Sequence, residues 1–389
     1  MSVSQPAVNH DLPADVTEWR RHLHQNPELL YEVHETARFV ADKLSAFGCD
    51  LVETGIGRTG VVALIRGDLG QGPVIGLRAD MDALPILESG SRAWVSKVDG
   101  RAHSCGHDGH MAMLLGAARL LAQTRKFRGT VAVIFQPAEE GGAGALAMVE
   151  DGLMERFGIA QVFGMHNEPG IPIGEFAIRE GAILAAVDTF EITIRGRGSH
   201  AGQPHLSIDP VVAASHVVVA LQSLVARETD PLQSVVITVA TINGGHSPNV
   251  IPAEVRLSGT VRTLRPDTRD WAQRRLFEVA SSIALAHGAA ATVDYTRGYP
   301  ATFNHREQTG RAIEVAQSVV GPEFVRVGIE PRMAAEDFSY MLEARPGAFI
   351  IIGNGNTANL HSPSYDFNDE AIPYGIAYWV KLAETLLAD

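Results

Sequence analysis

The sequence has little of several features that define other classes of protein. Its 389 residues include only two cysteines, Cys49 and Cys105, which argues against a disulfide scaffold and suits a reducing cytoplasm. Residues 1–13 contain neither a basic segment nor an apolar one, so no signal peptide is expected. The most apolar stretch, 211–225, is interrupted by Ser, His and Gln. We expect it to form a buried helix rather than a membrane span.

Positive charge is also scarce. The chain has 32 Lys and Arg against 45 Asp and Glu, a formal net charge of −13, which disfavours nucleic acids and anionic membrane surfaces as partners. An anionic small substrate would therefore need a local group of positive or hydrogen-bond-donating side chains. The composition, 46% hydrophobic and 20% charged, is that of a folded globular protein. A chain of this length is expected to form two domains.

The first half of the chain alternates predicted strands and helices. Short apolar runs predict strands at 61–65, 74–77, 131–135 and 162–165. Amphipathic or apolar patterns predict helices at 15–25, 35–47, 110–123 and 143–150. Such alternation of nearly continuous apolar strands with helices favours an α/β fold, in which a mostly parallel sheet is covered by helices on both faces.

The pattern changes after residue 186. Predicted strands at 189–194, 234–242, 254–264 and 291–297 alternate with helices at 210–227 and 268–287, where Asp209 is the N-cap and Pro210 the first helical residue. This β-α-β-β-α-β order is the split βαβ unit. The α/β pattern then resumes with a helix at 308–319, a helix at 335–342, a strand at 348–353 and a helix from about 369. We therefore predict a discontinuous catalytic domain, 1–186 and 301–389, with an inserted α+β domain at 187–300.

The segment HSCGHDGH, residues 103–110, concentrates potential metal ligands. A polar loop with ordinary histidines is the alternative, but so many ligands beside glycines favour a metal site. Cys105 and His107 are the best pair, because two loop residues spaced by one can converge on a point. His103 and Asp108 are predicted to orient the ligands, and His110 is predicted to turn away on the following helix.

The segment FQPAEEGG, residues 135–142, places two adjacent carboxylates after an apolar strand. One glutamate can bind metal while its neighbour takes a proton from the water that the metal activates. His166, in the segment GMHN, also follows an apolar run, and His361 is a further candidate near the C-terminus. We expect Glu139, Glu140 and His166 just past the carboxyl ends of strands, where open α/β sheets bind their ligands.

Further segments carry a resemblance that extends over nearly the whole chain. They are RRHLHQNPEL, GLRADMDALPI, CGHDGH, FQPAEEGG, GMHN, GRGSHA, NVIP, MAAEDFSYML and LHSPSYDFNDEAIPYG. With these motifs the chain resembles the N-acyl-amino-acid amidohydrolase branch of the co-catalytic metallopeptidases. That branch includes hippurate hydrolase, the plant auxin-conjugate hydrolases and bacterial aminoacylase-like enzymes.

The resemblance implies a role for each matching residue. It implies two divalent metal ions (zinc, manganese, cobalt or nickel) held by Cys105, His107, Glu140, His166 and His361, with Glu139 as the base. It also implies that the inserted domain is a lid through which the chain forms a homodimer or a higher homo-oligomer. In that domain His200, Asn249 and Arg262 would bind the substrate carboxylate and the developing oxyanion, the histidine often coming from the partner subunit. Lid packing and turn formation are the alternative roles for these three residues.

Three segments depart from the pattern of the wider superfamily. Arg78 stands where that superfamily has a metal-binding histidine, so Asp80 and Asp82 are given supporting roles, with Arg78 paired to one of them. The segment before His103 contains Trp94, which could line an acyl pocket or lie on the surface. The run His246-Ser247-Pro248 before Asn249 is also unusual.

The sequence therefore predicts a cytoplasmic, metal-dependent enzyme that hydrolyses the amide of a small N-acyl amino acid. A dipeptidase or an N-acetyl-diaminopimelate deacetylase would use the same core. A metal-dependent binding protein without turnover is an alternative of another class, and Glu139 argues against it because a pure binder has no use for a base beside the metals.

Overall fold

The computed structural model describes residues 15–388, so the stretch on which the signal-peptide expectation depends lies outside the described residues. The chain divides into two compact units. Of the described residues, unit 1 holds those up to Ile183, Phe303–Glu330 and those from Asp337 onward, and unit 2 holds Leu184–Thr302 and Pro331–Glu336. The sequence division places residues 331–336 in the larger domain. They cluster with unit 2, where the backbone oxygen of Ala334 accepts a hydrogen bond from the backbone nitrogen of Ala185 at 2.8 Å.

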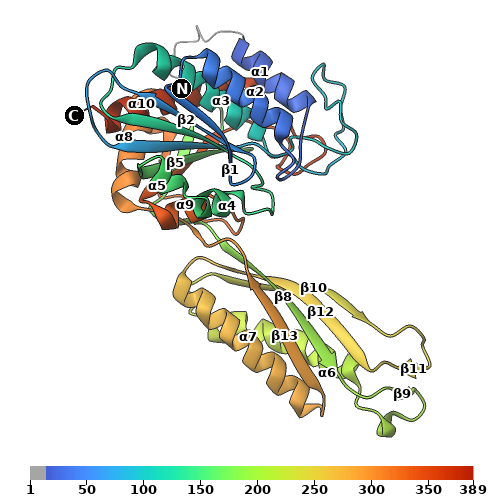
Figure 1. Cartoon of the computed structure of the whole chain (residues 1–389). Coiled ribbons are helices and arrows are strands. Elements are labelled where there is room, and N and C mark those ends of the chain that lie inside the picture. The colour runs from blue at the N-terminus through green and yellow to red at the C-terminus, as the bar shows by residue number, and fades with distance from the viewer. Residues whose placement is uncertain (1–14, 389) are drawn as a thin grey trace, which may run out of the picture. The chain divides into compact units, whose positions relative to one another are not determined.

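Unit 1 is built on an eight-stranded sheet (Figure 1) in the order β1-β2-β4-β3-β5-β16-β6-β15. Its four central strands, β4, β3, β5 and β16, run parallel, and antiparallel pairs join β2 to β4 and β16 to β6. The predicted α/β class with a mostly parallel sheet is confirmed. The strands are β1 Leu51–Ile56, β2 Gly60–Arg66, β3 Val74–Asp80, β4 Thr130–Gln136, β5 Ile159–Glu168, β6 Phe176–Ile178, β15 Val325–Val327 and β16 Gly347–Gly353. The short strands β7 Gly181–Leu184 and β14 Thr302–Asn304 pair with each other.

Helices cover both faces of this sheet. On one face, α3 and α8 pack on the strands and are covered in turn by α1 and α10, while α2 packs on β1 and β2. On the other face, α4 packs on β4 and α5 on β5, with α9 beside α4. The helices are α1 Asp15–Gln25, α2 His34–Ala46, α3 His107–Thr124, α4 Gly144–Glu150, α5 Leu153–Arg156, α8 Arg306–Val320, α9 Ser339–Ala344 and α10 Ile372–Leu386.

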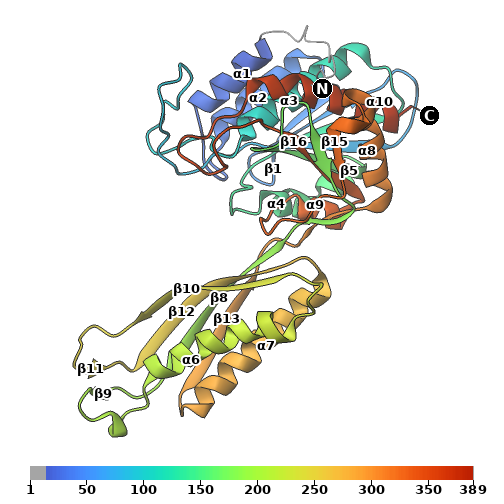
Figure 2. The same ribbon diagram turned by 180° about the vertical axis from the view of Figure 1, so that it is seen from behind.

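Unit 2 is a four-stranded antiparallel sheet with two helices on one face (Figure 2). Its strand order is β10-β12-β8-β13, and α6 and α7 pack against the sheet and each other. Phe190, Ile192 and Ile194 of β8 point into this core, as the alternating pattern predicts. The elements are β8 Ala186–Arg195, β9 Ser199–His200, α6 Pro210–Ser223, β10 Val235–Gly244, β11 Val250–Ile251, β12 Glu254–Thr263, α7 Pro266–Ala286 and β13 Ala290–Arg297. The β-α-β-β-α-β order is found as predicted, with the short pair β9 and β11 added.

By length and apolar composition alone, one helical stretch of the described chain, Pro210–Glu228, could cross a membrane. One side of it, including Val217 and Leu221, is buried in unit 2. The opposite side exposes Val211 and Val212 by nearly half and Val219 by 70%. The prediction of a buried helix is therefore correct for one face only, because the apolar residues of this stretch surround the helix.

Candidate metal centre

Four of the five predicted metal ligands belong to elements at one edge of the unit-1 sheet. Cys105 lies in the loop before α3, and His107 is the first residue of that helix. Glu140 follows β4 by four residues, and His166 lies near the carboxyl end of β5. The prediction that His166 follows its strand is wrong, because β5 continues to Glu168. The carboxyl ends of parallel strands meet at one edge, which is where open α/β sheets bind ligands.

The predicted ligands converge, including His361 from the loop after β16. Sγ of Cys105 lies 3.4 Å from Nε2 of His166, and Nε2 of His361 lies 3.2 Å from Oε1 of Glu140. Among the groups of the described residues whose possible donor atoms all lie within 4.8 Å of one another, two consist entirely of predicted ligands. One set is Cys105, His107 and His166, and the other is Cys105, Glu140 and His361. Cys105 belongs to both sets, so the arrangement has the form of two metal positions that share a thiolate.

The backbone around the ligands is conformationally restricted. Gly106 has φ +91°, and a Cβ atom there would collide with the side chains of Asn167 and Tyr365, so only glycine fits between Cys105 and His107. Nδ2 of Asn167 donates to the backbone oxygen of Cys105 at 2.6 Å. His361 has φ +62°, an uncommon conformation for a side-chain-bearing residue, and its backbone nitrogen donates to Ser104 at 2.8 Å.

His107 lies in surroundings built for a cation. Nε2 lies 3.6 Å from Asp80 Oδ2 and Nδ1 lies 3.6 Å from Asp82 Oδ1. Although burial lowers the pKa of His107, Asp80, Asp82 and Glu140 outweigh it and raise the pKa to about 10. Within residues 15–388, neither ring nitrogen makes a hydrogen bond. Two buried donor nitrogens without hydrogen-bonding partners, amid surplus negative charge, fit a metal ligand.

Burial favours the neutral forms of His166 and Cys105, which have different consequences for metal binding. It lowers the pKa of His166 to about 4, so this imidazole stays neutral with a lone pair to donate. Burial and the nearby carboxylates of Glu140 and Glu139 raise the pKa of the Cys105 thiol. A thiolate in this position needs a compensating cation, and a divalent metal supplies one. The donor set of thiolate, imidazole and carboxylate fits a borderline-soft divalent ion.

One carboxylate sets the position of both adjacent glutamates. Oδ1 of Asp82 accepts a hydrogen bond from the backbone nitrogen of Glu139 at 2.9 Å, and Oδ2 accepts one from that of Glu140 at 3.1 Å. Glu139 is 8% exposed, and its Oε1 accepts a hydrogen bond from the backbone nitrogen of Asp337 at 3.4 Å. The two glutamates are therefore fixed together, with Glu139 beside the ligand set rather than in solvent.

Asp80 links the metal ligands to a buried polar group. Its Oδ1 lies 2.6 Å from Nδ1 of His110, and its Oδ2 accepts a hydrogen bond from Arg78 at 2.9 Å. Arg78 thus pairs with Asp80, as predicted, and it also donates to Asp337 at 3.1 Å. Arg78, which stands where the wider superfamily has a metal-binding histidine, therefore neutralises the buried carboxylates of Asp80 and Asp337.

His110, His103 and Asp108 differ from their predicted positions. His110 does not turn away, since its ring centroid lies 4.6 Å from that of His166 and its Nε2 accepts a hydrogen bond from Asn167 at 3.0 Å. Asp108 points towards α1, where His24 lies 2.8 Å away. His103 is buried, and within the described chain its ring nitrogens make no hydrogen bonds. The carboxylates beside His107 are those of Asp80 and Asp82, to which the sequence also gave supporting roles. Within residues 15–388, neither Asp108 nor His103 makes a hydrogen bond, ion pair or ring contact with the ring of a predicted ligand.

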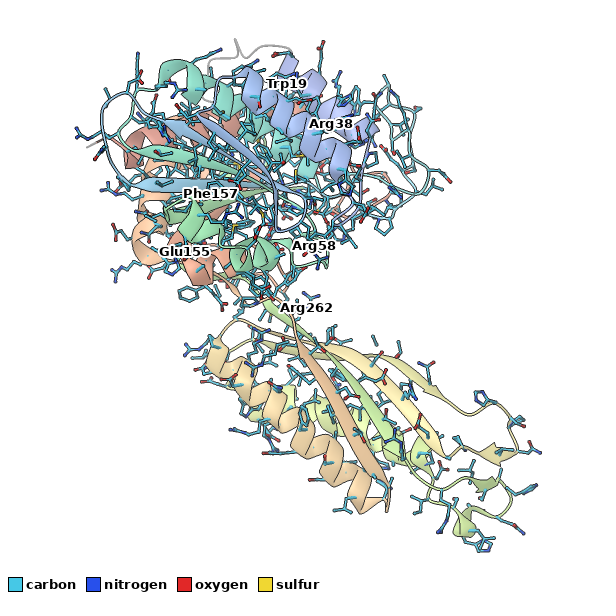
Figure 3. The ribbon with its side chains drawn as sticks, viewed as in Figure 1. Trp19, Arg38, Arg58, Glu155, Phe157 and Arg262 are labelled. Carbon is cyan, nitrogen blue, oxygen red and sulfur yellow. The ribbon has the colours of Figure 1, made fainter. Side chains whose placement is uncertain are left out.

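The predicted substrate-binding residues lie in unit 2, at two separate places. His200 pairs with Val250 across β9 and β11, and the backbone oxygen of Asn249 accepts a hydrogen bond from Ala201, so His200 and Asn249 are neighbours. Arg262, labelled in Figure 3, lies at the opposite end of β12 and donates to the backbone oxygen of Met333 at 2.8 Å. Unit 2 therefore brings His200 and Asn249 together but not Arg262.

The two unusual segments have structural contacts. Trp94 is half-buried, with the guanidinium of Arg21 3.7 Å from its ring centroid and its indole nitrogen 3.3 Å from Asp366. It thus packs in an ionic surface group rather than standing free in solvent. In the other segment, Oγ of Ser247 donates to Oδ1 of Asn249 at 2.5 Å, which orients the amide.

Sequence reasoning missed the backbone anchors of the site. Asn167 donates to Cys105, accepts a hydrogen bond from Tyr365 at 2.6 Å and contacts His110. Its position directly after His166 was the available signal. The double contact of Asp82 with the glutamate pair depends on how β3 and the loop after β4 lie in space, and no sequence spacing indicates it.

Comparison with known proteins agrees with this geometry. The model of peptidase family M20/M25/M40 matches residues 76–385. The chain is 41% identical to N-acetyl-L-cysteine deacetylase of Bacillus subtilis over 95% of its length and 87% of the relative's. It is 39% identical to hippurate hydrolase of Campylobacter jejuni over 96% and 97% of the two chains. A crystal structure from Bacillus subtilis, described as a dinuclear metal-binding peptidase from the M20 family, is similar with a TM-score of 0.85 and 35% identity, covering 96% and 98% of the two chains.

Proposed function

The chain belongs to peptidase family M20/M25/M40, and on this basis we propose that it is a metal-dependent amidohydrolase. It cleaves the amide bond of N-acyl amino acids and releases a carboxylic acid and a free amino acid. The observation that carries this proposal is the pair of donor sets sharing Cys105, with the carboxylate Glu139 adjoining Glu140. Relatives with similar sequences are named hippurate hydrolase and N-acetyl-L-cysteine deacetylase, which act on small N-acylated compounds of this class.

Each metal position takes three of the five ligands. Cys105, His107 and His166 would hold one ion, and Cys105, Glu140 and His361 would hold the other. Bound metal would supply Lewis acidity, which polarises the substrate carbonyl and lowers the pKa of water to around 7. The mixed donor set suits zinc, manganese, cobalt or nickel.

Glu139 performs the proton transfers. Its carboxylate accepts the proton that the attacking water loses and passes it to the leaving amine nitrogen. The hydrogen bonds from Glu139 and Glu140 to Asp82 fix the base relative to the neighbouring ligand. Because Glu139 is nearly buried, little bulk water competes for its proton.

Recognition of the substrate carboxylate is assigned to His200, Asn249 and Arg262. Arg262 pairs with Val187, whereas Glu254, at the other end of β12, pairs with Arg195, five residues before His200. Eight residues of strand separate the two ends, which is roughly 26 Å. A small acyl amino acid cannot span that distance. Because the family resemblance gives the histidine to the partner subunit, we assign His200 and its neighbour Asn249 to the site of a second copy of the chain and Arg262 to the site of its own chain.

This assignment requires a homodimer through unit 2. Two features support such an assembly: α6 exposes Val211, Val212 and Val219 along one face, and β10 is an edge strand that exposes Val236 and Ile242. Contiguous exposed apolar residues mark interaction surfaces, and an edge strand can pair with another chain. The cytoplasm is the proposed compartment, in keeping with the two free cysteines.

The test is hydrolysis of a panel of N-acyl amino acids before and after chelation, with manganese, zinc or cobalt restored singly. Dipeptides and N-acetyl-diaminopimelate belong in the same panel. The proposal predicts that acyl amino acids are cleaved, that chelation abolishes cleavage and that metal restores it. Cleavage of dipeptides alone would reassign the substrate, and metal binding without any cleavage would indicate a binding protein.

A further inference from the structure

A buried ionic group in unit 1 lies beside the metal centre without containing any of its ligands. At its middle is Arg20 of α1, which is fully buried. Its Nη1 donates to Asp108 at 3.3 Å and to Asp366 at 3.1 Å, and its Nε donates to Asp369 at 2.7 Å. One guanidinium therefore joins three carboxylates from distant parts of the chain.

These carboxylates flank two of the metal ligands. Asp108 directly follows His107 in the first turn of α3. Asp366 and Asp369 lie five and eight residues after His361, in the segment that leads into α10. Arg20 therefore ties the helix turn that carries His107 to the loop that carries His361.

Compared with the predicted ligands Glu140 and His107, His361 has the side chain that is least held by packing. Its side chain is 54% exposed, whereas that of Glu140 is 12% exposed and that of His107 is fully buried. It lies in an irregular loop, held at its own backbone by one hydrogen bond to Ser104. With little packing around the ring, its position follows from where the loop is anchored.

The guanidinium of Arg20 is suited to this anchoring because its planar set of N–H donors fixes the positions of the carboxylates that it binds. Several N–H donors in one plane hold carboxylates at set angles, whereas an ammonium group acts as a point charge. Arg20 and Asp108 are fully buried and the side chains of Asp366 and Asp369 are only 19% exposed, so little water competes for these hydrogen bonds.

We propose that Arg20 is a positioning residue for the metal position formed by Cys105, Glu140 and His361. It holds the His361 loop at the distance from α3 that lets His361 share an ion with Glu140 and Cys105. The proposal rests on the metal assignment made under the proposed function. It predicts that loss of Arg20 weakens one of two metal positions and leaves the other, formed by Cys105, His107 and His166, nearly intact.

The test is metal titration of the metal-free full chain, followed by elemental analysis after dialysis. Arg20→Met is expected to weaken one of two ions on the order of 10–100-fold, the range for residues that support a ligand, and to retain about one ion per chain. Arg20→Lys is expected to fall between this variant and the unmodified protein. The matched control is Arg21→Met, because Arg21 also binds Asp369, at 2.8 Å, but within residues 15–388 it makes no hydrogen bond or ion pair with Asp108 or Asp366. It is expected to bind two ions normally.

Coupling to His361 separates positioning from general stability. His361→Ala is expected to lose the same ion as Arg20→Met, and the double variant is expected to lose no more than either alone, because contacting parts of one unit are non-additive. Equal weakening of both ions in Arg20→Met, normal binding of both, the same loss in Arg21→Met, or additive losses in the double variant would each overturn the proposal.

If Arg20→Met does not fold, Arg20→Lys and Asp366→Asn carry the test, since Asp366 is partly exposed and its removal spares Arg20. Two ions bound normally by both of these variants would overturn the proposal. Unmodified protein that binds two ions but cleaves no acyl amino acid would refute the proposed function and leave the role of Arg20 testable. Unmodified protein that binds fewer than two ions would refute the premise of the positioning role.

Discussion

Sγ of Cys105 lies 3.4 Å from Nε2 of His166, while the same sulfur belongs to the donor set that contains Glu140 and His361. One thiolate thus stands at the junction of two potential ion positions. Cys105 is only 7% exposed, and burial and the neighbouring carboxylates raise the pKa of its thiol. It is therefore not a reactive surface thiol.

Sharing of Cys105 predicts unequal effects of ligand removal. Cys105→Ser should lose both ions, because a hydroxyl is a poorer ligand than a thiolate, whereas His166→Ala and His361→Ala should each lose one. Cys105→Asp should retain more metal than Cys105→Ser, since a carboxylate can bridge two ions. Elemental analysis of each variant measures this. One ion retained by Cys105→Ser would mean that the thiolate serves a single position.

The adjacent glutamates should separate metal binding from proton transfer. Glu139→Gln should keep two ions yet lose roughly 10²–10⁴-fold in kcat, the usual contribution of a general base. Glu140→Gln should lose metal as well as activity. Metal content and kcat measured on the same preparations test the assignment. Similar metal content in the two variants would contradict it.

The separation of Arg262 from His200 predicts complementation between chains. Neither His200→Ala nor Glu139→Gln should be active alone. After random subunit exchange, half of the dimers are mixed and each mixed dimer has one intact site, so about a quarter of full activity should return. Mixing Arg262→Ala with Glu139→Gln is the matched control and should restore nothing, since both residues serve the same chain's site. Activity that stays absent in the first mixture despite measured exchange would place His200 in its own chain's site.

His24 predicts a dependence of stability on pH. It lies 2.8 Å from Asp108 and 3.1 Å from Glu88, with Arg20 nearby and the ring of His103 at 6.3 Å. Burial lowers the pKa of His24, but Asp108 and Glu88 outweigh it and raise the pKa from 6.5 to about 9. Because the folded-state pKa is the higher one, the stabilisation is complete below pH 6.5 and is lost as pH rises through about 9.

The loss should amount to roughly 1–3 kcal/mol of unfolding free energy. Urea unfolding of the metal-free chain between pH 6 and 9.5 measures it. His24→Gln should flatten this part of the pH curve, whereas His34→Gln, an exposed histidine at the start of α2, should leave it unchanged. If the unfolding free energies of the unmodified chain and of His24→Gln changed equally with pH, charged His24 would not stabilise the fold through Asp108 and Glu88.

Much of the fold could be predicted because its signals are local. Apolar runs such as 131–135 correspond to buried strands, and Asp209-Pro210 opens α6 with two hydrogen bonds to the Asp209 side chain. Strand β1 was missed because it lies at the sheet edge, where only one of its residues is buried and no apolar run is present. The three-residue strands β6 and β15 are too short for any periodicity.

The site was predictable in its residue types and less so in its contacts. Sequence proximity to His107 favoured Asp108 and His103 as its supports, but the helix begins at His107 and directs Asp108 to α1. Asp80 and Asp82, about 25 residues earlier, were given supporting roles, but their position beside His107 was not foreseen, because it depends on β3 ending at that edge of the sheet. The division of five ligands into two sets likewise depends on distances that no spacing along the chain encodes.

The discontinuity of unit 1 governs the order in which the enzyme can be made. When His166 has left the ribosome, roughly 200 residues remain before His361 appears, which takes on the order of 10–40 s at usual elongation rates. During that time β5 lacks β16, its partner in the finished sheet, and α3 lacks α10. Four of the five predicted metal ligands are thus carried by an unfinished sheet while unit 2, which is continuous apart from six residues, can already fold. The donor set of Cys105, Glu140 and His361 can therefore form only after His361 has been synthesised.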